Sequence, residues 1–325
     1  MKLATLRDGS RDGYLVVVSR DLQRAVAAPI ATMRDAIEDW ERSEPVLRTL
    51  FSALEAGTAT GAFAFDPARA MAPLPRAYQW CDGSAFLNHG TLMQKAFNLD
   101  PIEGADQTPL MYQGAGDDFL GAQQDICLPS VSQGIDFEGE FGVLLDDVPL
   151  GCSAQDALSH IKLLVQINDV SLRALAPREM KTGFGFLHAK PSSAFAPVAV
   201  TPDELGDDWR DGRVQRPLNV EWNGQWFGNP HAGEMNFSFG ALVAHAAFTR
   251  KLGAGTLIGS GTISNRDRAA GSACIAERRA IEMIDHGGVR TAFMQFGDRV
   301  KMEVFGADGQ SIFGAIDQRV VQANG

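Results

Sequence analysis

The amino-acid sequence predicts a β-rich α+β fold, because it lacks the regular alternation of strands and helices that builds a doubly wound sheet. The recognisable strands are short, helical patterns are few, and the 325 residues include 34 glycines. No glycine-rich GxGxxG or GxxxxGK[ST] segment follows a strand. A nucleotide-binding function therefore has no support in the sequence.

The composition indicates which binding partners and which cellular compartment to expect. The 29 Lys and Arg residues against 40 Asp and Glu give a formal charge of −11, which disfavours nucleic acid and anionic membranes. No apolar run approaches the roughly 20 residues of a membrane span, and the first residues do not resemble a signal peptide. We expect a cytoplasmic protein whose thiols are not paired. Its four cysteines have no CxxC spacing: Cys81, Cys127, Cys152 and Cys274.

A small N-terminal α/β domain is expected over residues 1–75. Residues 14–18 are rich in valine and predict a strand, and two helical patterns follow near residues 33–40 and 44–56. The stretch 66–75 carries three prolines and is typical of a linker. The remaining residues, 76–325, form the second predicted domain.

The second domain shows more strand than helix. Residues 135–145 alternate, with Asp136, Glu138 and Glu140 facing away from an apolar side. A capping box at 153–156 predicts a helix through residue 164, and 165–170 predicts a strand. Asn223-Gly224 predicts a hairpin turn. A helix over 239–249 and strands over 299–305 and 311–316 complete the expected elements.

Acidic residues lie on two of these strands. Glu138 and Glu140 are two apart on a strand, so their side chains leave one face with Cβ atoms about 6.5–7 Å apart. A hard cation such as Mg²⁺, Mn²⁺ or Ca²⁺ would relieve their repulsion. Asp169 ends the strand at 165–170 and would point toward a pocket. The alternatives are a solvent-facing acidic strand and, for Asn168-Asp169, a turn signal.

One histidine follows an aspartate at a suggestive spacing. Asp82 and His89 are seven apart, which on a helix places them two turns apart on one face, roughly 10.5 Å along the axis. One group could bind a metal ion while the other acts on substrate as a general base. The alternative is a structural or surface histidine.

Together these segments resemble the fumarylacetoacetate hydrolase family along most of residues 78–316. The family's metal site consists of an Asp seven residues before its catalytic His, an ExE pair, and an Asp in an N-D segment. The resemblance implies metal ligation by Asp82, Glu138, Glu140 and Asp169, and His89 as the catalytic base. It also implies a mixed β-sandwich roll for the catalytic domain, residues 76–325.

Further residues match the family one by one. Arg173 falls four past the N-D aspartate, and Lys190 matches the active-site lysine. Tyr112 and Thr262 match the substrate-contacting tyrosine and the threonine of a Gly-Thr loop. The glutamate that orients the histidine should follow that loop; the local spacing differs, and Glu277 is the best candidate.

Two positions depart from the family pattern. Asn98 replaces an arginine that some members carry nine residues past the histidine, and Lys95 is the nearest cation that could bind substrate in its place. Ala176 replaces a glutamine. These departures weaken the assignment of fumarylacetoacetate itself as substrate more than they weaken the reaction class.

The resemblance implies a fumarylacetoacetase-like hydrolase of aromatic amino acid catabolism, a homodimer that cleaves a carbon–carbon bond in a β-diketone acid with a divalent cation, Mg²⁺ or Ca²⁺ and alternatively Mn²⁺. Lys190 would counter developing negative charge, and Arg173 would bind a carboxylate or brace the metal-ligand loop. A 2-oxo acid decarboxylase or a 2-keto-4-pentenoate-type hydratase needs the same cation chelation, so both stay open. A catalytically silent metal- or ligand-binding protein is the alternative from another class.

Overall fold

A large mixed sheet forms the centre of the molecule. The computed structural model describes residues 1–98 and 100–323. Eleven strands make this sheet, in the order β4-β3-β2-β1-β13-β10-β9-β18-β5-β6, with β12 paired to β10. Its strands are β1 (Lys2–Leu6), β2 (Tyr14–Val18), β3 (Arg24–Ala27), β4 (Phe63–Ala64), β5 (Trp80–Gly83), β6 (Met111–Gly114), β9 (Gly139–Leu145), β10 (Ile161–Asn168), β12 (Ala194–Phe195), β13 (Ala199–Val200) and β18 (Leu257–Gly259).

A second sheet of five strands has the order β17-β16-β19-β20-β7, and two short ribbons pair β8 with β11 and β14 with β15. The remaining strands are β7 (Ile126–Leu128), β8 (Ile135–Asp136), β11 (Ser171–Leu172), β14 (Trp209–Arg210), β15 (Arg213–Val214), β16 (Asn219–Trp222), β17 (Gln225–Gly228), β19 (Arg299–Glu303) and β20 (Ile316–Gln322). Within the described residues the chain forms more strands than helices, so the prediction of a β-rich α+β fold is confirmed.

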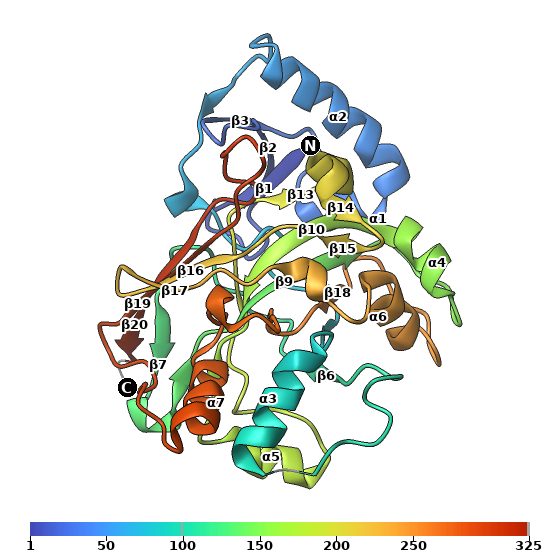
Figure 1. The fold of residues 1–325 in the computed structure, drawn as a ribbon. Helices are drawn as coiled ribbons and strands as arrows, with labels where there is room; N and C mark the ends of the chain where they lie inside the picture. Colours follow the sequence, from blue (N-terminus) through green and yellow to red (C-terminus); the bar gives the residue numbers. More distant parts are fainter. Residues whose placement is uncertain (99, 324–325) are drawn as a thin grey trace.

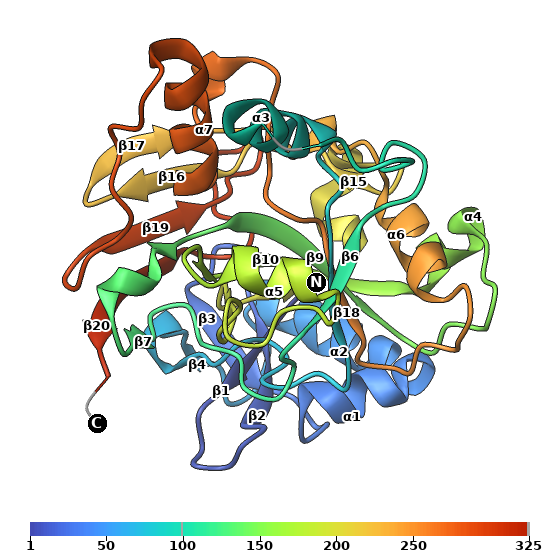
Figure 2. The same ribbon diagram turned by 90° about the horizontal axis from the view of Figure 1, so that it is seen from below.

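The helices lie around the sheets. They are α1 (Met33–Glu38), α2 (Trp40–Glu55), α3 (Leu87–Phe97), α4 (Ala154–Ala157), α5 (Ala176–Thr182), α6 (Phe239–Ala246) and α7 (Ile275–His286). Figure 1 shows α1 and α2 at the N-terminal end with β1–β3, and α3, α5 and α7 at the opposite end. Helices α3 and α7 contact each other, as Figure 2 also shows. Within the described residues, no helix has the length and apolarity to cross a bilayer.

The N-terminal segment shares the central sheet with the rest of the chain. Strand β1 pairs antiparallel with β2 on one side and with β13 on the other. One buried apolar cluster joins Met33, Ile37 and Leu47 of α1 and α2 to Leu163 and Val165 of β10. The division of the chain near residue 75 stays a prediction, because continuous packing of this kind does not by itself locate a domain boundary.

Several predicted elements appear where the sequence placed them. Strand β2 covers residues 14–18, and α1, α2 and α6 occupy the predicted helical stretches. Asn223 and Gly224 join β16 to β17 with φ angles of 53° and 72°, as a type I′ turn requires.

Three local predictions are wrong. The helix that starts after Ser153 ends at Ala157, and β10 begins at Ile161, because this apolar run pairs with β9 instead of continuing the helix. Residues 311–316 form only a bridge before β20 begins at Ile316. Asp82 and His89 do not share a helix: Asp82 lies in β5 and His89 in α3.

Candidate functional site

Three carboxylates from distant parts of the sequence meet beside the central sheet. Asp82 lies in β5, Glu140 in β9, and Asp169 directly after β10. One oxygen of each lies within 4.8 Å of an oxygen of the others, and all three side chains are buried. We call these residues the oxygen trio.

Strand pairing and two glycines create the space for Asp82. In the sheet, Asp82 of β5 lies opposite Gly259 of β18, which in turn lies opposite Gly142 of β9. A Cβ atom at Gly259 would lie 2.4 Å from Asp82 Oδ1, so only glycine leaves room for this carboxylate. Gly261 has a φ of 75° and donates its N–H to Asp82 Oδ1 at 3.0 Å. A side chain at Gly261 would also collide with the carbonyl oxygen of Gly83.

Within the oxygen trio, Glu140 is the carboxylate with the fewest hydrogen-bond partners among the described residues. Its side chain is fully buried, and neither carboxylate oxygen has a hydrogen-bond partner among the described residues. Burial, and then the charge of Asp82, raises the pKa of Glu140 well above its ordinary value. Burial, and then the charge of Asp169, raises the pKa of Asp82 to about 8. A buried carboxylate without partners is costly, and a bound cation is the usual compensation.

Asp169 has three side-chain partners. Tyr112 donates its hydroxyl at 2.5 Å and Lys190 its ammonium at 2.6 Å to Asp169 Oδ2, while Ser193 donates at 2.7 Å to Oδ1. Tyr112 lies directly opposite Asp82 across β5 and β6, so two neighbouring strands bring it to the oxygen trio. The polar contacts hold Asp169 in a fixed orientation.

Lys190 connects Asp169 with Glu138. Its ammonium donates to Glu138 Oε2 as well as to Asp169. Burial alone would lower its pKa, but the carboxylates of Asp169 and Glu138 outweigh burial and raise it. Glu179 holds the loop before Lys190, because its carboxylate accepts the backbone N–H groups of residues 187–189.

Glu138 does not face the same partners as Glu140. The strand is interrupted between β8 and β9, where Asn168 Oδ1 accepts the Glu138 backbone N–H at 3.1 Å. The Glu138 carboxylate accepts hydrogen bonds from Arg173 and Ser171 as well as from Lys190. Burial would raise the pKa of Glu138, but Arg173 and Lys190 outweigh burial and lower it. Direct metal ligation by Glu138 stays a prediction.

Arg173 links Glu138 to the start of α7. Its Nε donates to Asp136 Oδ2 at 2.9 Å and its terminal nitrogen to Glu138 Oε1 at 2.5 Å. Asp136 also accepts the backbone N–H groups of Ile275 and Ala276 at the N-terminus of α7, where a negative charge is favourable. Arg173 thus braces the start of α7 against the segment that carries Glu138.

His89 and Glu277 form a pair. His89 Nδ1 lies 2.9 Å from Glu277 Oε2, and the glutamate is 1% exposed. Glu277 lies in the first turn of α7, and α3, which carries His89, packs against that helix. The structure brings Glu277 to the histidine, as its proposed orienting role requires. The catalytic roles of both residues stay predictions.

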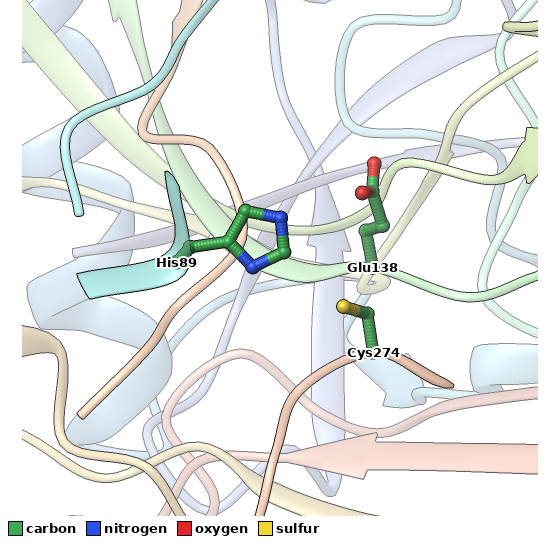
Figure 3. Close-up of side chains that lie close together, drawn as sticks. All are labelled: His89, Glu138 and Cys274. Atoms are coloured by element: carbon green, nitrogen blue, oxygen red, sulfur yellow. The ribbon is translucent and has the colours of Figure 1, made fainter. Parts of the chain in front are cut away.

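A second group of donor atoms surrounds His89. A ring nitrogen of His89, a carboxylate oxygen of Glu138 and Cys274 Sγ lie within 4.8 Å of one another. Figure 3 shows the three side chains close together. We call these residues the mixed trio.

The other predicted residues differ in placement. Thr262 is buried directly after Gly261 and thus next to the oxygen trio. Lys95 is exposed on α3 and, within the described residues, has no hydrogen bond or ion pair with the other predicted site residues. Asn98 ends α3 in the left-handed conformation at φ 50°, a helix-capping role that an asparagine performs well. Ala176 begins α5.

Sequence reasoning missed several residues of the site. Ser171 and Ser193 each donate to a predicted site carboxylate, Asp136 connects Arg173 to α7, and Cys274 lies beside His89. Each is within three residues of a recognised one: Asp169, Lys190, Glu138 and Glu277. Their closeness in sequence to recognised site residues was the one signal that could have found them. A single serine or cysteine forms no pattern that marks it as functional.

Comparison with known proteins places this geometry in a family. The family model described as fumarylacetoacetate (FAA) hydrolase C-terminal matches residues 79–321, and fumarylacetoacetase N-terminal domain 2 matches residues 1–76. The 2,4-didehydro-3-deoxy-L-rhamnonate hydrolase of Sphingomonas sp. (strain SKA58) is 31% identical over 47% of this chain and 52% of its own. The mitochondrial oxaloacetate tautomerase fahd2 of Xenopus laevis is 26% identical over 47% of each chain. The chain spans about half the length of the curated relatives it matches.

Solved structures share the fold. Maleylpyruvate hydrolase from Sphingobium sp. SYK-6, in complex with manganese (II) ion and pyruvate, superposes over 100% of both chains with a TM-score of 0.66 at 16% identity. The 2-hydroxyhepta-2,4-diene-1,7-dioate isomerase from Mycobacterium marinum covers 81% of this chain and 82% of its own, with a TM-score of 0.55 at 19% identity. Because the C-terminal family model spans most of the chain and the folds agree, this protein belongs to the fumarylacetoacetate hydrolase family.

Proposed function

We propose that this protein hydrolyses a carbon–carbon bond in a β-diketone acid, such as fumarylacetoacetate or an acylpyruvate, with the help of a divalent cation. The observation that carries the proposal is Glu140, a buried carboxylate that has no hydrogen-bond partner among residues 1–98 and 100–323 and faces two more carboxylates. Carboxylates crowded in this way are favourable only if protons or a bound cation offset their charge.

The oxygen trio fits a hard cation. Asp82, Glu140 and Asp169 offer only carboxylate oxygens, the donors that Mg²⁺, Ca²⁺ and Mn²⁺ prefer. When bound, such a cation polarises a substrate carbonyl and stabilises enolate charge. Glu138 lies across Lys190 from Asp169, and we keep it as the fourth ligand of the proposal.

His89 is the proposed base for the attacking water. Glu277 engages Nδ1, which leaves Nε2 as the nitrogen that can take a proton. Since Glu277 is buried, its carboxylate holds the ring orientation and stabilises the imidazolium that forms. Hydrolysis requires water activation, whereas decarboxylation of a 2-oxo acid does not, so the pair favours hydrolysis.

Basic and hydroxyl groups complete the proposal. Lys190 lies against the oxygen trio and would counter negative charge on the leaving carbon. Tyr112 and Thr262 are the proposed substrate-contacting residues, while Lys95 would have to approach from the exposed side of α3. For Arg173 we propose a bracing role and not the binding of a substrate carboxylate, because its guanidinium already donates to Asp136 and Glu138.

A substrate panel tests the proposal. Purified protein would be assayed with Mg²⁺, Mn²⁺ or Ca²⁺ on fumarylacetoacetate, on acylpyruvates and on oxaloacetate. We expect cation-dependent cleavage of a β-diketone acid that chelator abolishes. Turnover of oxaloacetate alone would support the decarboxylase or the tautomerase named among the relatives, and cation binding without any turnover would support a silent binding protein.

A further inference from the structure

The mixed trio has the donor atoms of a different class of metal ion. Nitrogen, sulfur and oxygen donors come from His89, Cys274 and Glu138, within 4.8 Å of one another. Imidazole and thiolate are ligands that Zn²⁺ prefers, whereas Mg²⁺ and Ca²⁺ prefer oxygen alone. The mixed trio and the oxygen trio therefore differ in the cation that each would select.

The imidazole of His89 is oriented as in metal-binding histidines. Such a histidine usually donates its second ring N–H to a carboxylate, which fixes the tautomer and raises the basicity of the other nitrogen. Here the buried carboxylate of Glu277 lies 2.9 Å from Nδ1. Nε2 is thus left for the space between Glu138 and Cys274 (Figure 3).

Cys274 is held in place by the backbone. It is the N-cap of α7, and its Sγ accepts the Glu277 backbone N–H at 3.3 Å. The thiol is fully buried. A thiolate at this position therefore needs a positively charged partner.

The surrounding charges leave room for one dication. Asp136, Glu138, Glu277 and a Cys274 thiolate are four negative groups, and among the described residues Arg173 and Lys190 are the cations paired with them. Because Lys190 is also shared with Asp169, the negative groups outnumber these cations, and a bound dication is favourable. Glu138 Oε1 accepts only from Arg173 among the described residues, so one of its lone pairs stays open.

We propose that His89, Cys274 and Glu138 form a second cation site, selective for thiophilic dications such as Zn²⁺, beside the oxygen trio. Binding forms a zinc–sulfur bond as the Cys274 thiol releases its proton to solvent, without any oxidation or reduction. Coordination rests only on this geometry. Its consequence for turnover, inhibition through capture of His89, rests on the proposed function.

Cobalt spectroscopy tests the coordination without any assay of activity. Protein saturated with Mg²⁺ would be titrated with Co²⁺, which reports a thiolate ligand through an intense near-ultraviolet charge-transfer band. We expect this band in the native protein and in Cys127→Ser, which removes an exposed thiol. We expect Cys274→Ser to abolish it, although serine keeps the N-cap of α7.

Zinc binding provides the second readout. We expect about one proton released per Zn²⁺, and an affinity at least about tenfold weaker in Cys274→Ser, since even outer-shell changes cost about 10–100-fold. Should Cys274→Ser fail to fold, X-ray absorption at the zinc edge of the native protein should show one sulfur neighbour. A cobalt band that survives in Cys274→Ser, or zinc without a sulfur neighbour, would overturn the proposal.

Discussion

Lys190 connects the oxygen trio with the mixed trio, but the two clusters differ in how their negative charge is offset. In the oxygen trio, Glu140 has no partner within the described residues, and burial raises the pKa of both Glu140 and Asp82. In the mixed trio, Arg173 and Lys190 neutralise Glu138 and lower its pKa. The oxygen trio needs protons or an added cation to offset its charge, whereas in the mixed trio the chain's own cations already pair with Glu138.

The difference assigns separate tasks to the two glutamates of the ExE segment. Glu140 lies in the oxygen trio, while Glu138, the proposed fourth ligand, also connects Lys190, Arg173 and the surroundings of His89. An interruption between β8 and β9 lies at Glu138, where the backbone N–H donates to the Asn168 side chain and the carbonyl accepts the Asp169 N–H.

Glu140→Gln should have the most severe effect on activity. The neutral amide removes one anionic ligand, and Lewis-acid stabilisation is worth several kcal/mol, so we expect kcat/KM to fall by at least about 10³-fold. Calorimetry should show weaker cation binding as well. Glu41→Gln on the exposed side of α2 is the matched control. Unchanged cation affinity in Glu140→Gln would contradict the assignment of the oxygen trio.

His89→Gln should remove water activation and leave cation binding intact. A positioned base contributes about 10²–10⁴-fold, so hydrolysis should fall by roughly 10³-fold. Decarboxylation of oxaloacetate, if the protein performs it, should be unaffected. His286→Gln, at the exposed end of α7, should behave as the native protein does. Equal loss of both reactions would argue against His89 as the base for water.

The order of motifs could be predicted from the sequence, but their geometry could not. Asp82 and His89 were predicted on one helix, yet the backbone passes from β5 into α3 between them. The position of Asp82 depends on pairing with Gly259, 177 residues later, which no local pattern reveals. For the same reason the helix expected through residue 164 was wrong: β9 recruits Ile161–Asn168 as a strand.

Glu277→Gln should have a smaller effect than either change above. The amide can still hydrogen-bond to His89 Nδ1, but it no longer stabilises the imidazolium. We expect kcat to fall by about 10–100-fold with little change in KM. The acid limb of the pH–rate profile should move to lower pH. A fall in thermal stability with an unshifted profile would indicate a structural role only.

The pH dependence of stability should differ with and without cation. The pKa of Asp82 is about 8 in the folded protein and 3.8 as the ordinary value, so folding takes up a proton between these values. Without cation, stability should therefore fall as the pH rises from about 4 to about 8. Cation binding displaces that proton, so its affinity should rise over the same range.

Thermal unfolding measures this pH dependence of cation affinity, the smallest of the expected effects. A tenfold gain in affinity per pH unit is worth about 1.4 kcal/mol, or a few degrees in Tm. The Tm increase caused by Mn²⁺ should be larger at pH 8 than at pH 6. In Glu140→Gln the increase should shrink at both pH values. A Tm increase that is independent of pH would mean that the cation binds at groups already ionised at pH 6.

The most direct measurement is the anomalous scattering of Mn²⁺ in crystals of the native protein. The account predicts a peak within coordination distance of Asp82, Glu140 and Asp169, with both previously unpaired oxygens of Glu140 turned toward the ion or toward water bound to it. A peak that lies away from Glu140, or none at saturating Mn²⁺, would contradict it.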